Sequence, residues 1–293
     1  MNAGKYYGVD VLILGGDVTG KGMVYAVEEQ DGSYRATFMG KEYLLKSSDE
    51  ILNFEKNVRL FGFYPLKTSK EEVERLSESE EARHEVFLKL MIETLKRWIT
   101  FGEEKLKGSG IGLYVTAGND DDFAIDSVLS ESNVVIHADR RVVEVDRDHE
   151  MISSSYSNLT PWKCPRDISE NELEQKIEAM AGQVNNMKNC IFNLHVPPIN
   201  SMLDNAPLLD ENLNPKDAGQ VIGGVGSTAV RKAIELHQPL LGLHGHIHES
   251  KGFTNIGRTL CVNPGSTYSE GIVQGVVVRL GRDRVDGYWP VQG

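Results

Sequence analysis

The sequence predicts an α/β protein of ordinary globular type. Its 293 residues are 40% apolar and 25% charged, a balance that supports a packed core. Four short apolar segments have the β-branched character of buried strands, and each ends in a polar or glycine-rich loop. Amphipathic helical patterns lie between these segments. Strands that alternate with helices in this way are typical of a sheet covered by helices.

The loops that follow the four predicted strands carry most of the side chains suited to chemistry. The strands cover residues 9–14, 113–116, 190–194 and 240–243. In that order they lead into Gly15-Gly16-Asp17, Ala117-Gly118-Asn119-Asp120, His195-Val196-Pro197-Pro198 and His244-Gly245-His246-Ile247-His248. Ligands of open α/β sheets gather beyond the carboxyl ends of strands, so these loops are expected to lie together.

Three segments have the spacing of helices. Residues 80–107 place apolar side chains at near-helical intervals over a long stretch. Residues 169–187 open with Ser169-Glu170-Asn171-Glu172, which resembles a capping box. Residues 226–237 are predicted to begin a helix near Ser227 or Thr228 that stops before Pro239.

A β-rich stretch near the N-terminus differs from the rest. Residues 23–46 alternate in polarity and contain turns at 30–33 and 39–41, which predicts a three-strand meander. A charged helix is expected at 48–59. We therefore interpret residues 25–107 as an insertion that could form a cap, and residues 1–24 and 108–293 as the core. Further strands that close a second sheet layer are expected across 262–290.

Composition also limits the function. The 31 basic and 43 acidic side chains give a net charge of −12 without a basic block, which argues against a long nucleic acid as partner. No run approaches the roughly 18 apolar residues of a membrane span, and the N-terminus lacks an apolar signal core. The three cysteines lack metal-like spacing and are read as reduced thiols. These features predict a cytoplasmic protein; the oligomeric state stays open.

Five side chains in the loops form a candidate metal site: Asp17, Asn119, His195, His246 and His248. One carboxylate, one amide oxygen and three imidazoles suit borderline divalent ions such as Mn, Fe, Co, Ni or Zn. His246 and His248 are separated by one residue and would point to the same side of an extended chain, within reach of two ions. Asp17 has two oxygens and could bridge such a pair, about 3.5–4 Å apart.

The motifs Gly16-Asp17, Gly118-Asn119-Asp120-Asp121, His195 and Gly245-His246-Ile247-His248 together resemble those of the calcineurin-like metallophosphoesterases. The resemblance covers most of the chain outside residues 25–107. It implies a four-layer α/β/β/α sandwich with two packed mixed sheets. It further implies that Asp17 bridges two metals, that Asn119, His195 and His246 hold one of them, and that His248 holds the other.

Two positions depart from the family pattern. The family opens with a D-x-H motif that helps to hold the metal of His248, and this sequence contains no such motif. Only ten residues precede Val11, so the chain is expected to begin inside the first β-α-β unit, without its first β-α part, and to hold one ion rather than two. Asp120 stands where many members have a proton-donating histidine. Because aspartate is normally ionised at neutral pH, good leaving groups are expected to react best.

The sequence thus predicts a metal-dependent phosphoesterase that hydrolyses a small phosphomonoester or phosphodiester through a metal-activated water. Asn119, Asp120 and His246 are the candidate catalytic residues, manganese is one candidate metal, and the partner is a small phosphorylated substrate. The alternative is a regulatory or binding protein on the same scaffold with impaired turnover. A serine hydrolase is disfavoured because the chain lacks a G-x-S-x-G elbow.

Several other residues have ordinary structural interpretations. His244 is expected in the core or behind the metal ligands, and the remaining histidines, at 84, 137, 149 and 237, at the surface or in packing. Trp162 could line a substrate pocket or simply pack. The glycine-rich run 219–226 lacks a phosphate-binding lysine in frame and is expected to be a flexible loop rather than a nucleotide cradle.

Overall fold

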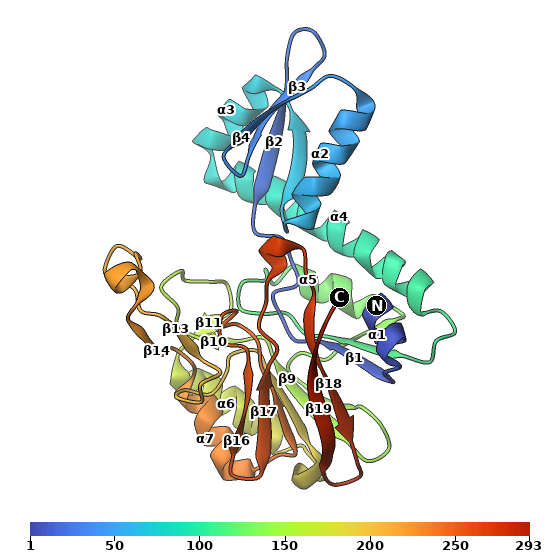
Figure 1. The fold of residues 1–293 in the computed structure, drawn as a ribbon, viewed down its shortest axis with the longest axis vertical. Coiled ribbons are helices and arrows are strands. Elements are labelled where there is room, and N and C mark those ends of the chain that lie inside the picture. The colour runs from blue at the N-terminus through green and yellow to red at the C-terminus, as the bar shows by residue number, and fades with distance from the viewer. The chain divides into compact units, whose positions relative to one another are not determined.

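The computed structural model describes residues 1–293, except for the side chain of residue 269. The chain is of mixed α/β type and divides into two compact units (Figure 1). The larger unit comprises Met1–Val18, Ile99–Thr267 and Val273–Gly293, and the smaller comprises Thr19–Trp98 and Tyr268–Ile272. One boundary falls inside the long helix α4 (Glu80–Leu106), so the smaller unit is not bounded at residues 25 and 107.

The smaller unit is a four-stranded sheet with helices. Strands β2 (Met23–Glu28), β3 (Tyr34–Phe38) and β4 (Lys41–Leu45) form the expected antiparallel meander, and β5 (Tyr64–Thr68) adds to β2 in parallel. Helix α2 (Ser48–Leu60) begins with a capping box between Ser47 and Glu50. Its buried face joins the sheet in an apolar cluster that includes Val24, Phe38, Phe54 and Val58. Helix α3 (Lys70–Glu78) follows β5.

A six-stranded sheet is the centre of the larger unit. Its order is β16-β17-β15-β12-β9-β8. The strands are β8 (Val142–Glu144), β9 (Glu150–Ser154), β12 (Ile191–Leu194), β15 (Leu241–Leu243), β16 (Gly252–Ile256) and β17 (Thr259–Asn263). Helices α6 (Glu170–Ala181) and α7 (Thr228–His237) cover one face, because their apolar side chains share one buried cluster with Ile152, Phe192 and Cys261.

The other face of this sheet packs against a second β layer. Parallel strands β1 (Val11–Leu14), β6 (Gly112–Val115) and β7 (Val135–His137) form a sheet of order β1-β6-β7. Ile13 and Tyr114 from this sheet lie in one cluster with Ile191 and Leu241 from the central sheet. The hairpin of β18 (Gln274–Leu280) and β19 (Val285–Gln292) adds Val276 to the same cluster. Two sheets therefore pack face to face, with their strand ends close together.

Short elements complete the larger unit. They are α1 (Asn2–Tyr7), α5 (Ile125–Ser130), β10 (Ser157–Asn158), β11 (Asp167–Ile168), β13 (Asn205–Pro207), β14 (Ile222–Gly224), and the 3-10 helices η1 (Met187–Asn189) and η2 (Lys216–Gly219). A third 3-10 helix, η3 (Tyr268–Glu270), belongs to the smaller unit. Among the described residues, no helix is both long and apolar enough to cross a membrane.

Two local expectations were wrong. The predicted loop 219–226 contains β14, which pairs with β13. The helix predicted to reach residue 187 ends at Ala181, since Gly182 follows and the main-chain N–H groups of Asn185 and Asn186 donate to Glu150 instead. The strands expected across 262–290 are present as β18 and β19, which pair with each other in a hairpin.

The start of α6 also differs in detail from the expected capping box. Ser169 caps the helix by accepting a hydrogen bond from the N–H of Glu172. The carboxylate of Glu170, however, caps the neighbouring helix α7, because it accepts from the N–H groups of Thr228 (3.0 Å) and Ala229 (2.9 Å). This bond joins the two helices on the same face of the central sheet.

Candidate metal centre

Asp17 lies directly after β1, in a turn that only glycine allows. Gly16 has a φ of 130° and Asp17 a φ of 50°, both outside the range that side chains favour. A Cβ atom on Gly16 would lie 2.7 Å from Cε1 of His195 and would overlap its Nδ1. The sequence Gly-Gly-Asp therefore lets the carboxylate turn back against the imidazole that comes from the other sheet.

Asn119 reaches the same place from the end of β6. A Cβ atom on Gly118 would overlap Oδ1 of Asp17 and lie 2.7 Å from Cε1 of His195, so this position also requires glycine. The buried carboxylate of Asp121 accepts hydrogen bonds from the N–H groups of Gly118 (2.7 Å) and Val18 (3.0 Å). Asp121 thus ties together the two loops that carry Asp17 and Asn119.

His195 follows β12 and is only 2% exposed. Its Nδ1 lies 3.0 Å from the carbonyl oxygen of Gly15, which directs Nε2 toward Oδ2 of Asp17 (3.4 Å) and Oδ1 of Asn119 (3.2 Å). Burial by itself lowers the pKa of His195, but the Asp17 carboxylate, together with the Gly15 carbonyl and Asp121, outweighs burial and raises the pKa above its ordinary value. The negative charge of Asp17 therefore favours a positive charge beside Nε2 of His195.

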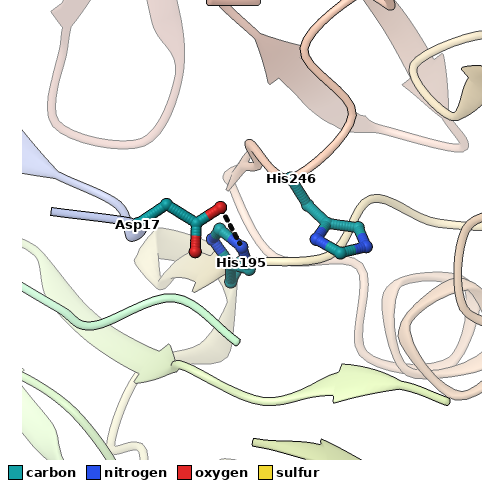
Figure 2. A group of neighbouring side chains, drawn as sticks. All are labelled: Asp17, His195 and His246. Carbon is teal, nitrogen blue, oxygen red and sulfur yellow. Dashed lines mark ion pairs between the residues drawn. The ribbon is translucent and has the colours of Figure 1, made fainter. Parts of the chain in front are cut away.

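His246 lies in the loop after β15. Its Nδ1 is 2.9 Å from Oδ1 of Asn119, and its Nε2 is 3.3 Å from the hydroxyl of Ser157. Burial and the neighbouring His195 lower the pKa of His246 to about 3, so the imidazole is neutral at neutral pH, as a metal ligand must be. Ligand atoms of Asp17, His195 and His246 all lie within 4.8 Å of one another (Figure 2).

The expected arrangement of His246 and His248 on an extended chain is wrong. His246 has a φ of 62°, in the left-handed region, so the alternation of an extended strand does not apply to this segment. Among the described residues, the close group contains His246 but not His248. The carbonyl of His248 accepts a hydrogen bond from the N–H of Ser266 (3.1 Å).

The donor set of Asp17, Asn119, His195 and His246 fits one divalent ion. Nδ2 of Asn119 donates to Asp167, which leaves Oδ1 facing the imidazoles; with Nδ1 of His195 donating to Gly15, its Nε2 also presents a lone pair. Potential ligand atoms thus converge at separations of 2.9–3.4 Å. Atoms that each lie about 2.1 Å from one ion are roughly 3.0–3.4 Å apart at ordinary ligand angles. A bound cation, or protons on Nε2 of His195 and Nδ1 of His246, would relieve the repulsion between these atoms.

The remaining predicted residues surround this group. Asp120 is exposed, and its main-chain N–H donates to Oδ1 of Asp17 (3.3 Å). Its carboxylate lies 4.0 Å from Sγ of Cys164. Trp162 is 65% exposed, which rules out a packing role, whereas His244 is buried and has its Nδ1 2.8 Å from the carbonyl of Leu194. Burial lowers the pKa of His244 to about 4.

A second group of close ligand atoms, from Asp126, His137 and Asp139, is better explained as an ion-pair network. Arg166 lies 2.7 Å from Oδ1 of Asp126, and Arg140 lies 2.7 Å from its Oδ2 and 3.1 Å from Oδ2 of Asp139. Two guanidinium groups balance the two carboxylates and would repel a metal ion. Burial lowers the pKa of His137, which keeps its ring neutral.

Sequence reasoning missed the residues that support the ligands from behind. Besides Asp121, which the motif contains, Ser157, Arg166 and Asp167 each contact the ligand loops through hydrogen bonds. Asp167 lies in the short β11, which pairs with β10, so it meets Asn119 across 48 positions of sequence. No motif marks such a contact, because it depends on the path of an irregular loop.

Replacing Gly118 with alanine is expected to weaken metal binding and hydrolysis together. The added methyl group would overlap both the carboxylate and the main-chain nitrogen of Asp17 and would force Asp17 or His195 out of place. Manganese binding by titration calorimetry measures the effect. Gly108→Ala is the control, because a Cβ at that positive-φ glycine meets nothing within 4 Å and carries only the backbone strain. Equal manganese affinity in the two variants would contradict the prediction.

Comparison with known proteins leaves the family open. No family model matches the chain. Over 140 residues it is 32% identical to the uncharacterized protein MJ1162 of Methanocaldococcus jannaschii, a match that covers 47% of this chain and 57% of that protein. The match therefore spans little more than half the length of this curated relative.

Two solved structures from Thermus thermophilus are distantly similar. The protein TT1561 has a TM-score of 0.38 and 17% identity, over 61% of this chain and 73% of that chain. The sulfate thiohydrolase SoxB, in complex with glycerol, has a TM-score of 0.34 and 14% identity, over 83% of this chain and 41% of that chain. These scores are too low to support a functional conclusion, which has to come from the site.

Proposed function

We propose that the chain is a metal-dependent phosphoesterase of the calcineurin-like type, acting on a small phosphomonoester or phosphodiester. The observation that carries this proposal is the convergence of potential ligand atoms from Asp17, Asn119, His195 and His246 at separations of 2.9–3.4 Å. The order of these residues along the chain, each after a strand, supports the same family as the sequence motifs. The four-layer sandwich belongs to this proposal.

Asp17, Asn119, His195 and His246 would hold the ion, and His248 would serve a second position if one is filled. Manganese, iron, zinc, cobalt and nickel all suit these ligands. A divalent ion bound there supplies Lewis-acid stabilisation of phosphoryl oxygens and a water that ionises near neutral pH. The hydrogen bond from His195 to Gly15 fixes the tautomer that presents Nε2 to the ion.

The other side chains would handle the substrate. Asp120 lies at the exposed edge of the site and is proposed to assist departure of the leaving group, with Asn119 and His246 beside the reacting phosphoryl group. A net charge of −12 favours small phosphates over polymeric nucleic acid, since it disfavours a long phosphate backbone. Residues 25–107 are proposed to form a cap that selects the substrate.

The test measures bound metal and phosphoester hydrolysis on the same protein sample. Purified protein is freed of loose ions, its bound metal is counted, and hydrolysis of p-nitrophenyl phosphate and bis(p-nitrophenyl) phosphate is followed with added manganese. Bound metal with turnover that EDTA abolishes is the expected result. Bound metal without turnover would favour the alternative of a regulatory or binding protein. Absence of any metal binding would refute the assigned ligands.

A further inference from the structure

Asp167 contacts the candidate metal centre through one hydrogen bond to the side chain of Asn119. Its Oδ1 accepts a hydrogen bond of 2.8 Å from Nδ2 of Asn119. Its Oδ2 accepts from the N–H groups of Thr160 (3.0 Å) and Cys164 (2.9 Å) and from the hydroxyl of Thr160. The carboxylate is half-buried and is held on both sides. Asp167 is therefore a fixed acceptor behind Asn119.

We infer that Asp167 is a positioning residue that sets which end of the Asn119 amide faces the metal. This inference rests on the proposed metal centre. The two ends of an amide have nearly the same shape, and only the oxygen can bind a metal ion. An ionised carboxylate only accepts hydrogen bonds, so it selects the orientation in which Nδ2 points toward Asp167. The opposite orientation would set two oxygens against each other and turn an NH₂ group toward His195 and His246.

The main chain around Asn119 is fixed by a different residue. Arg166 donates from its own N–H to the carbonyl of Asn119 (3.1 Å) and from Nε to the carbonyl of Asp121 (2.8 Å). Its side chain is fully buried. Because Arg166 already holds the loop, what remains for Asp167 is the rotation of the Asn119 side chain. A change at Asp167 should therefore alter metal affinity more than the fold.

The first test is Asp167→Asn, with manganese binding measured by titration calorimetry and by electron paramagnetic resonance in the absence of substrate. The three donors that face Oδ2 of Asp167 would hold the oxygen of the asparagine there, so its NH₂ group would face residue 119 and no longer accept from Nδ2 of Asn119. We expect manganese affinity to fall about 10- to 100-fold, the usual loss for a partner behind a metal ligand. Unchanged affinity would overturn the inference.

Exchanging the residue types at positions 119 and 167 separates the effect of Asp167 on the orientation of the Asn119 amide from any other role of Asp167. In the double variant Asn119→Asp with Asp167→Asn, both ends of residue 119 are oxygens, so no orientation needs to be selected. Asparagine at 167 can still donate to residue 119. We expect this double variant to bind manganese more tightly than Asp167→Asn alone. Equal or weaker binding would show that the single variant lost affinity for another reason, and would overturn the inference.

Thr160→Val is the matched control. It removes the hydroxyl that donates to Oδ2 of Asp167 but leaves the bond to Asn119 in place. Manganese affinity is expected to change little, and thermal unfolding in EDTA shows whether each variant is folded. Equal losses in Thr160→Val and Asp167→Asn would mean that the 160–164 loop, rather than the amide, is what Asp167 holds.

These outcomes remain distinct from failure of the proposed function. If the wild-type protein binds manganese and hydrolyses nothing, the phosphoesterase proposal fails, while the binding data on Asp167 keep their meaning. If the wild-type protein binds no divalent ion, Asn119 is not a ligand and both proposals fall.

Discussion

Replacing Asp17 with asparagine is expected to reduce phosphoester hydrolysis by more than 100-fold. Asp17 is the only carboxylate among the four converging ligands, and it carries the negative charge that raises the pKa of His195. Changes behind a ligand already cost about 10- to 100-fold, so loss of the charged ligand should cost more. The isosteric side chain keeps the shape of the turn while removing the charge. The value of kcat/KM on p-nitrophenyl phosphate with manganese measures the effect.

The control for this prediction is Asp286→Asn. Asp286 lies in the exposed hairpin strand β19 and pairs with Arg284 at 2.6 Å, so its loss should leave hydrolysis unchanged. Manganese binding measured on both variants shows whether the activity follows the metal. Near wild-type turnover by Asp17→Asn would remove Asp17 from the site, and with it the proposed centre.

Replacing Arg166 with leucine is expected to destabilise the larger unit by about 3–5 kcal/mol, the usual cost of removing one partner from a buried ion pair. The guanidinium is 0% exposed, and it bonds to Asp126, to Ser155 and to the carbonyls of the ligand loop. Without it, the fully buried carboxylate of Asp139 keeps less positive charge around it. Urea denaturation followed by circular dichroism measures the change.

Arg140→Leu is the comparison for Arg166. Arg140 pairs with the same two aspartates, at 2.7 and 3.1 Å, but its side chain is 44% exposed. Solvent screens such a pair, so its removal should cost no more than about 1 kcal/mol. A loss as large as that of Arg166→Leu would show that burial does not separate the two arginines and would contradict the explanation.

The parts of the site that the sequence could predict are those that follow from chain order. Asp17, Asn119, His195 and His246 each come after an apolar run, and strands of one sheet or of two packed sheets bring such ends together. The parts that escaped prediction depend on irregular backbone. His246 adopts a left-handed conformation in a loop, which redirects its side chain relative to His248. Asp167 meets Asn119 only because the chain returns to the same place 48 positions later.

The fold likewise contains elements that local sequence signals predict and elements that depend on distant contacts. Turns marked by glycine, as at 30–33 and 39–41, and the cap of Ser47 and Glu50 are local signals that predict the elements around them. The short strand β14 has no such signal, because the pairing that defines it comes from β13, outside the segment. The early end of α6 likewise depends on Glu150, which draws the following residues away from the helix axis.

The four candidate ligands belong to two different sheets, two from each. Asp17 and Asn119 follow β1 and β6 of the smaller sheet, and His195 and His246 follow β12 and β15 of the central sheet. An ion shared among them would act as a cross-link between the two packed sheets, closing a loop of chain much as a disulfide does. At 100 times its dissociation constant, such an ion would add about 2.7 kcal/mol to the stability of the folded state. The layers could then separate only after the ion had left, so chelation should make the larger unit easier to unfold and to cleave with a protease.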